Sequence, residues 1–125
     1  MALEPGLSAS IDLKVEEADT ARGMRSGDVS VLATPRIVAL MEEASCAAVA
    51  GHLQPGHTTV GMRVQVDHVQ PTAVGRTVTA TATLDRVTGR KLLFSVSAND
   101  ERGLIAAGKV TRVMVNRERF LEKCG

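Results

Sequence analysis

The sequence predicts an α+β protein in which one long helix packs on an antiparallel sheet. Two observations predict this class. Residues 34–52 carry apolar or small side chains at the spacing of a helix face, and Pro35 suits the first turn of a helix. After residue 58 the spacing of the apolar side chains changes to two, which is typical of strands. With a length of 125 residues, we expect a single domain over residues 1–125.

The remaining segments can be assigned in chain order. Residues 1–8 are expected to form a loose tail, and the alternating stretch that begins at residue 10 predicts a first strand. Residues 21–30 contain two glycines and are typical of a loop, which could cover a nearby site. Thr34 suits the N-cap of the helix, and the turn residues at 53–56 follow its end.

Four strands are expected after the helix. The first ends on His68, and its even-numbered residues share one face with that histidine. The others are predicted at 76–87, 92–98 and 104–115, with a hairpin turn signal at 88–90. We expect the four strands to form a meander. Because a single helix covers only one face of such a sheet, a two-fold partner is also expected.

The composition limits the classes of function. Hydrophobic residues make up 44% and charged residues 23% of the chain, as in ordinary soluble globular proteins. The 15 basic and 14 acidic residues give a net charge of +1, and the basic residues are spread along the chain, which argues against a nucleic-acid partner. A few of them could still meet a phosphorylated small molecule. With two Phe and no Trp or Tyr, the core must be aliphatic, and oligomerisation would bury more apolar surface.

Location and metal content are constrained as well. Cys46 and Cys124 lie far apart without disulfide-framework spacing, so reduced thiols in a cytoplasmic protein are expected. The N-terminus lacks the pattern of a signal peptide, and no apolar run reaches the ~18 residues of a membrane span, so no membrane partner is expected. The histidines and cysteines show no metal-ligand spacing, so no metal is expected.

Three side chains could carry chemistry. Glu42 lies on the expected helix about 80° around and about 12 Å along from Thr34, so both could face one cavity. His68 ends the first strand after the helix and could act as a general base or position a water molecule. Each has a simpler interpretation: a helix cap for Thr34, a surface carboxylate for Glu42 and a histidine at the sheet rim for His68.

Three other positions are also of interest. Gly61 interrupts a β-branched strand, which indicates either a close approach to the backbone, for example by a ligand, or a bulge. Arg112 lies within the last strand, where it could pair with a carboxylate or meet a phosphate. Cys46 follows Glu42 by one helical turn and is expected to be a packed thiol, because no histidine lies at a local spacing that would activate it.

Taken together, these pieces resemble the hotdog-fold thioesterases, and more closely the fluoroacetyl-CoA thioesterase-like group. The resemblance spans roughly residues 25 to 120. Its matching pieces are ATP (33–35), VALMEEA (38–44), LQPG (53–56), Val60-Gly61, VDH (66–68), the stretch 78–98 and GKVTRVMV (108–115). The resemblance implies a curved antiparallel sheet of about five strands wrapped around the helix, and a side-by-side homodimer with its sites at the interface.

The resemblance also implies roles for the candidate residues. Thr34, Glu42 and His68 would act together on an acyl-CoA thioester. The backbone N–H of Gly61 would lie near the thioester carbonyl, and Arg112 matches an arginine that is common in the last strand. The phenylalanine lid of the fluoroacetyl-specific members corresponds here to Asp28, so the resemblance does not extend to selectivity for a fluorinated acyl group.

The expected function is therefore hydrolysis of a small acyl-CoA thioester to the free acid and CoA, without a metal or other cofactor. Glu42 could act as the nucleophile or as a base toward water. Two alternatives stay open, because a fold does not fix a function. One is a non-catalytic protein that binds acyl-CoA. The other is a hotdog enoyl-CoA hydratase or dehydratase, although such enzymes place an acid and a histidine a few residues apart, a pair that this chain lacks.

Overall fold

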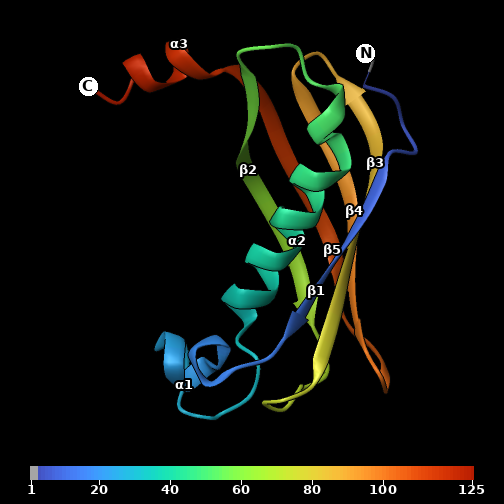
Figure 1. Ribbon diagram of the computed structural model, residues 1–125, viewed down its shortest axis with the longest axis vertical. Helices are drawn as coiled ribbons and strands as arrows, with labels where there is room; N and C mark the ends of the chain where they lie inside the picture. The colour runs from blue at the N-terminus through green and yellow to red at the C-terminus, as the bar shows by residue number, and fades with distance from the viewer. Residues whose placement is uncertain (1–2) are drawn as a thin grey trace.

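A computed structural model of the protein describes residues 3–125. Five antiparallel strands form one sheet in the order β1-β3-β4-β5-β2, and the helix α2 lies along one face of it (Figure 1). The strands are β1 (Ser8–Lys14), β2 (His57–His68), β3 (Thr77–Thr88), β4 (Lys91–Asp100) and β5 (Gly103–Asn116). The helices are η1 (Glu17–Asp19), α1 (Ala21–Met24), α2 (Thr34–Val49), η2 (Ala50–His52) and α3 (Arg117–Glu122). This arrangement confirms the predicted α+β class.

The expected four-strand meander is wrong for β2. Strands β3, β4 and β5 follow one another in the sheet, but β2 pairs with β5 at the far edge. The link between β2 and β3 is too long for a tight hairpin. It is instead tied to the segment before α2, where Leu32 N–H donates to Thr72 O at 2.9 Å and Val31 forms a bridge with Ala73.

Two other boundaries differ from the prediction. The expected loop at 21–30 begins with the short helix α1, whose first turn is capped by Thr20 Oγ1 accepting from Gly23 N–H at 2.9 Å. The expected tail contacts the sheet, since Gly6 N–H donates to Leu84 O at 2.8 Å and β1 already begins at Ser8. Residues 1 and 2 of that tail lie outside the described residues.

The core lies between α2 and the sheet and is almost entirely aliphatic. The buried residues of α2 recur at helical spacing, and they are Ile37, Leu40, Met41, Ala44, Ser45, Ala48 and Val49. They pack against alternate residues of β3 and β4, among which Phe94 is the largest fully buried side chain. The opposite side of α2, including Ala39, Glu43 and Ala47, is exposed.

A bulge in β2 breaks the alternation that the sequence predicted. The register between β2 and β5 shifts between Gly61 and Arg63, and Met62 projects outward with 52% of its surface exposed. The prediction that the even-numbered residues of β2 share one face with His68 is therefore wrong before the bulge, where Thr59 is buried on the helix side. It holds after the bulge, where Val64 packs on the core. The bulge interpretation of Gly61 is thus confirmed.

Candidate functional site

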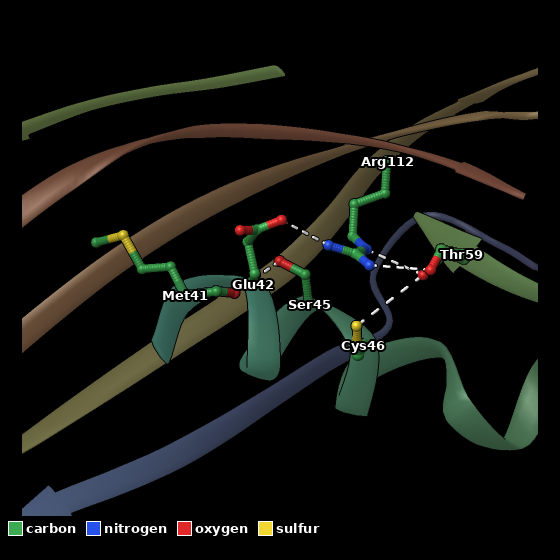
Figure 2. Close-up of polar contacts among 6 residues, drawn as sticks. All are labelled: Met41, Glu42, Ser45, Cys46, Thr59 and Arg112. Atoms are coloured by element: carbon green, nitrogen blue, oxygen red, sulfur yellow. Dashed lines mark hydrogen bonds and ion pairs between the residues drawn. The ribbon is translucent and has the colours of Figure 1, made fainter. Parts of the chain in front are cut away.

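The candidate residues identified from the sequence gather in two clusters along α2. The first is built on Arg112 of β5, which is 7% exposed and lies beneath the helix. Its Nη1 donates to Glu42 Oε2 at 2.8 Å, its Nε to Thr59 Oγ1 at 2.9 Å and its Nη2 to Thr59 O at 3.0 Å (Figure 2). Arg112 thus pairs with a carboxylate, which was one of its two interpretations, and Glu42 is more than a free surface carboxylate.

Glu42 is held by one carboxylate oxygen and partly open on the other side. Its side chain is 32% exposed, whereas the Arg112 side chain is 8% exposed. The ion pair is therefore semi-buried, and its geometry is fixed mainly by the buried guanidinium, which Thr59 holds by two further hydrogen bonds. Within residues 3–125, the other carboxylate oxygen of Glu42 has no hydrogen-bond partner.

Gly61 lies directly against this carboxylate. A Cβ atom at Gly61 would overlap Glu42 Oε2 and would lie 3.4 Å from Arg112 Nη1. The predicted close approach therefore exists, and the approaching group is the side chain of Glu42. The absence of a side chain at Gly61 is what lets an acid, a guanidinium and a strand backbone share this space.

The second cluster joins Thr34 to His68. Thr34 Oγ1 lies 2.7 Å from His68 Nδ1, which joins the first residue of α2 to the last residue of β2. The other ring nitrogen, Nε2, is buried and has no hydrogen-bond partner within residues 3–125. The His68 side chain also borders a shallow hollow of about 220 Å³, together with Val31 and Pro71.

The prediction that Thr34 is the N-cap is wrong. Ala33 occupies the cap position without a side-chain hydrogen bond, and Thr34 is already helical. The Ala33 carbonyl accepts from the N–H groups of Arg36 and Ile37, both at 3.1 Å, so the first turn is closed by the backbone. The hydroxyl of Thr34 is therefore not needed for capping and binds His68 instead.

The two clusters are separate within one chain. Thr34 and Glu42 lie eight residues apart on α2, which corresponds to about 12 Å along the helix axis. Among residues 3–125, no hydrogen bond joins Glu42 to Thr34 or His68. The structure therefore pairs Thr34 with His68, and Glu42 with Gly61 and Arg112.

Two residues near the first cluster differ from the prediction. Cys46 is exposed rather than packed, and its Sγ lies 4.0 Å from Thr59 Oγ1 (Figure 2). Sequence reasoning missed Thr59, because regular alternation placed it on the face away from the helix. A glycine inside a β-branched strand was the one signal that the alternation could break there.

Two other kinds of feature, a metal-binding cluster and a membrane-spanning helix, have no candidate among residues 3–125. Nowhere in this range do three His, Cys, Asp or Glu side chains gather so that they could hold a metal ion. None of the helices in the described part of the chain has the length and apolar character needed to span a membrane.

Known proteins are similar to this chain in sequence and in fold. The family described as fluoroacetyl-CoA-specific thioesterase (FlK) matches residues 15–118. The fluoroacetyl-CoA thioesterase of Streptantibioticus cattleyicolor is 41% identical over 93 residues, which are 74% of this chain and 67% of the relative. A variant of the fluoroacetyl-CoA-specific thioesterase FlK, solved in complex with fluoroacetate and CoA, superimposes with a TM-score of 0.89 at 34% identity, over 94% of this chain and 99% of that one.

The fold is also shared more widely. A hot-dog-like protein from Thermanaerovibrio acidaminovorans superimposes with a TM-score of 0.88 at 27% identity, over 96% of this chain and 89% of that one. The hotdog fold expected from the resemblance is thereby confirmed. Since the family match spans most of the sequence, the chain belongs to the fluoroacetyl-CoA-specific thioesterase family.

Proposed function

We propose that this protein hydrolyses a small acyl-CoA thioester to the free acid and CoA, with Glu42, His68 and Thr34 as its chemical groups. Membership of a thioesterase family supports thioester hydrolysis. The observation that carries the assignment to these residues is the contact between the Glu42 carboxylate and the Gly61 backbone. If Glu42 is the nucleophile or base, it would act next to a strand bulge, where a thioester carbonyl could meet both.

Glu42 is suited to attack because its orientation is fixed. Arg112 holds one oxygen at 2.8 Å, and the other oxygen remains available to the substrate or to water. It could attack the thioester carbon to form a mixed anhydride, or it could take a proton from an attacking water molecule. In either case the CoA thiolate leaves readily, so the proposed reaction needs no metal or other cofactor.

The bulge that begins at Gly61 would supply the polarising group. A bulge leaves an extra residue unpaired in the ladder, so backbone N–H groups around Met62 are turned away from regular pairing with β5. An N–H group aimed at the thioester oxygen would stabilise the negative charge that develops there. The missing side chain at Gly61 keeps this approach open.

His68 would act on water through its unpartnered nitrogen. If Nδ1–H donates to Thr34 Oγ1, the lone pair on Nε2 is free to accept a proton. Thr34 then fixes the tautomer and the orientation of the ring. The proposed role of Thr34 is accordingly to position His68 rather than Glu42.

We further propose that the working unit is a homodimer. Strand β2 is an edge strand whose outer side is unpaired among residues 3–125, and Met62 and Val69 beside this edge are 52% and 58% exposed. A two-fold partner that added its own β2 here would cover both residues. It would also bring the exposed side of a second α2 near the first. Glu42 of one chain could then approach the Thr34–His68 pair of the other chain, which lies apart from Glu42 within a single chain.

An assay of acetyl-, propionyl- and fluoroacetyl-CoA with a thiol reagent tests the activity, once the signal is corrected for the exposed thiols of Cys46 and Cys124. Glu42→Ala and His68→Ala should each lower kcat/KM by about 10²–10⁴-fold. Glu43→Ala is the matched control, since Glu43 is the exposed neighbour on the same helix. Full turnover by the first two variants would refute the roles, and acetyl-CoA binding without product over hours would indicate a non-catalytic binder.

Mixed dimers test whether one site draws on two chains. Glu42→Ala and His68→Ala homodimers are each expected to be inactive. A heterodimer of the two variants regains one intact site only if the acid and the imidazole of a site come from different chains. Activity in purified heterodimers supports the two-chain site, while inactivity of the heterodimer, or a monomeric mass in solution, contradicts it.

A further inference from the structure

A second hollow lies at the end of the sheet that is opposite to Thr34. It has a volume of about 310 Å³ and lies between α3 and the adjoining parts of β2 and β5. In Figure 1, α3 projects from the sheet at this end. The hollow is lined by the cationic side chains Arg90, Arg119 and Lys123 and by the apolar side chains Met114, Val115 and Phe120.

The positive charge in this hollow is uncompensated. Arg90, Arg119 and Lys123 form no ion pair with any acid among residues 3–125. The acidic residues of α3, Glu118 and Glu122, are not part of the lining. Three unpaired cations around one small concave surface favour an anion with several negative charges, and Arg is the side chain that binds phosphate oxygens best.

The lining residues come from separate parts of the chain but are held together by the fold. Arg90 lies in the turn between β3 and β4, and its carbonyl accepts from Met114 N–H at 2.8 Å. The start of α3 is fixed to the loop before β2, since Arg117 N–H donates to Gly56 O at 2.9 Å. Asn116 Oδ1 caps α3 by accepting from Arg119 N–H at 3.1 Å. The hollow is therefore a defined feature of the fold.

The apolar lining narrows the class of ligand further. Phe120 offers an aromatic ring beside the cations, and Met114 and Val115 add apolar atoms to the lining. A flat heteroaromatic base can stack on such a ring while its phosphates meet the arginines. A nucleotide that carries several phosphates has both features, whereas an inorganic anion would leave the apolar part unused.

The hollow adjoins the Glu42–Arg112 cluster. Met114 is paired with Thr59, the residue that holds Arg112, and it lies on the same face as Arg112, about 7 Å further along β5. We propose that this hollow binds the 3′-phosphoadenosine diphosphate end of CoA, with its pantetheine arm running past Thr59 to the carboxylate of Glu42. This inference rests on the proposed function, and it assigns recognition of the CoA nucleotide to Arg90, Arg119 and Lys123.

Calorimetry with CoA and with 3′-dephospho-CoA tests the inference without relying on catalysis. The protein should bind CoA about tenfold more tightly than 3′-dephospho-CoA, because one charged contact is lost. Arg119→Ala and Lys123→Ala should each reduce that preference. Arg117→Ala, an exposed change on the same helix outside the lining, should retain it. Equal binding of the two ligands, or an unchanged preference in both lining variants, would overturn the inference.

A truncated substrate separates this inference from the proposed function. S-acetyl-N-acetylcysteamine carries the thioester without the nucleotide, so Arg119→Ala should hydrolyse it as fast as the unmodified protein while losing kcat/KM toward acetyl-CoA. Equal loss with both substrates would assign Arg119 a general structural role and overturn the inference. Absence of hydrolysis with every thioester would count against the proposed function, whereas the CoA binding preference would still decide the inference. The protein could instead hydrolyse an acetylated carrier protein in an Arg119-dependent way and bind CoA no more tightly than 3′-dephospho-CoA. That result would overturn the inference and indicate that the hollow binds a protein partner.

Discussion

Gly61→Ala is the substitution that probes the proposed site most directly. The new Cβ would overlap Glu42 Oε2, so the carboxylate would have to retreat by about 1 Å to reach ordinary van der Waals contact. That movement stretches or breaks its 2.8 Å hydrogen bond with Arg112. A hydrogen bond between charged groups contributes about 1.5–3 kcal/mol, and the one-third exposure of Glu42 places the expected loss near the lower end of this range.

The expected results follow from that displacement. Thermal unfolding should occur about 5 °C below that of the unmodified protein. A reacting group displaced by about 1 Å typically loses about 10²-fold in rate, so kcat/KM toward the best acyl-CoA should fall by about that factor. Gly51→Ala is the matched control, because a Cβ there meets nothing within 4 Å. It should leave activity unchanged.

A double-mutant cycle identifies the atom responsible. In a Glu42→Ala background the overlapping carboxylate is gone, so Gly61→Ala should then cost only a few tenths of a kcal/mol in the free energy of unfolding. If Gly61→Ala destabilised both backgrounds equally, the overlap with Glu42 would not be its cause. If it behaved like Gly51→Ala in stability and in turnover, the proposed packing of Gly61 against a reactive Glu42 would be refuted.

Three further substitutions test the surroundings of the site. Arg112→Met should lower the free energy of unfolding by about 2–3 kcal/mol in urea denaturation, because it leaves a semi-buried carboxylate unpaired; an unchanged midpoint would contradict this. Burial raises the pKa of Asp100, but the Thr72 hydroxyl, the Arg102 N–H and nearby arginine charges outweigh it and hold the pKa below 3.8. That stability is present above pH 3.8 and lost as the pH falls through the lower folded value. Thr72→Val should therefore lower Tm at pH 7, and the difference in Tm should narrow as the pH falls further below 3.8. Gly108→Ala would drive a Cβ into the backbone of β2, so calorimetry should show a Tm loss of several degrees, unlike Gly51→Ala.

Local patterns predicted much of this fold. The spacing of apolar residues located α2, β3, β4 and β5 to within a few residues, because each of these elements buries one regular face. The turn at Gly89 was also predictable, since its φ of 60° is a conformation that glycine adopts without strain. These features depend on residues that lie close together in the sequence.

Features that depend on distant contacts were not predictable in this way. The pairing of β2 with β5 joins residues about fifty positions apart, and no local pattern specifies it. The hydroxyl of Thr34 had a sufficient local explanation as a cap, and only the arrival of His68 at the end of β2 gives it another partner. Likewise, Arg90 and Arg119 look scattered in the sequence and share one hollow only because β4, β5 and α3 meet there.

The bulge at Met62 explains why one strand can serve both clusters. In a regular strand, residues an odd number of positions apart point to opposite faces, so Gly61 and His68 could not both face α2. The extra residue in β2 shifts the parity by one, and Thr59, Gly61 and His68 then all lie on the helix side. The bulge that breaks the regular alternation therefore also brings Gly61, which lies against Glu42, and the imidazole of His68 to the same face of the sheet.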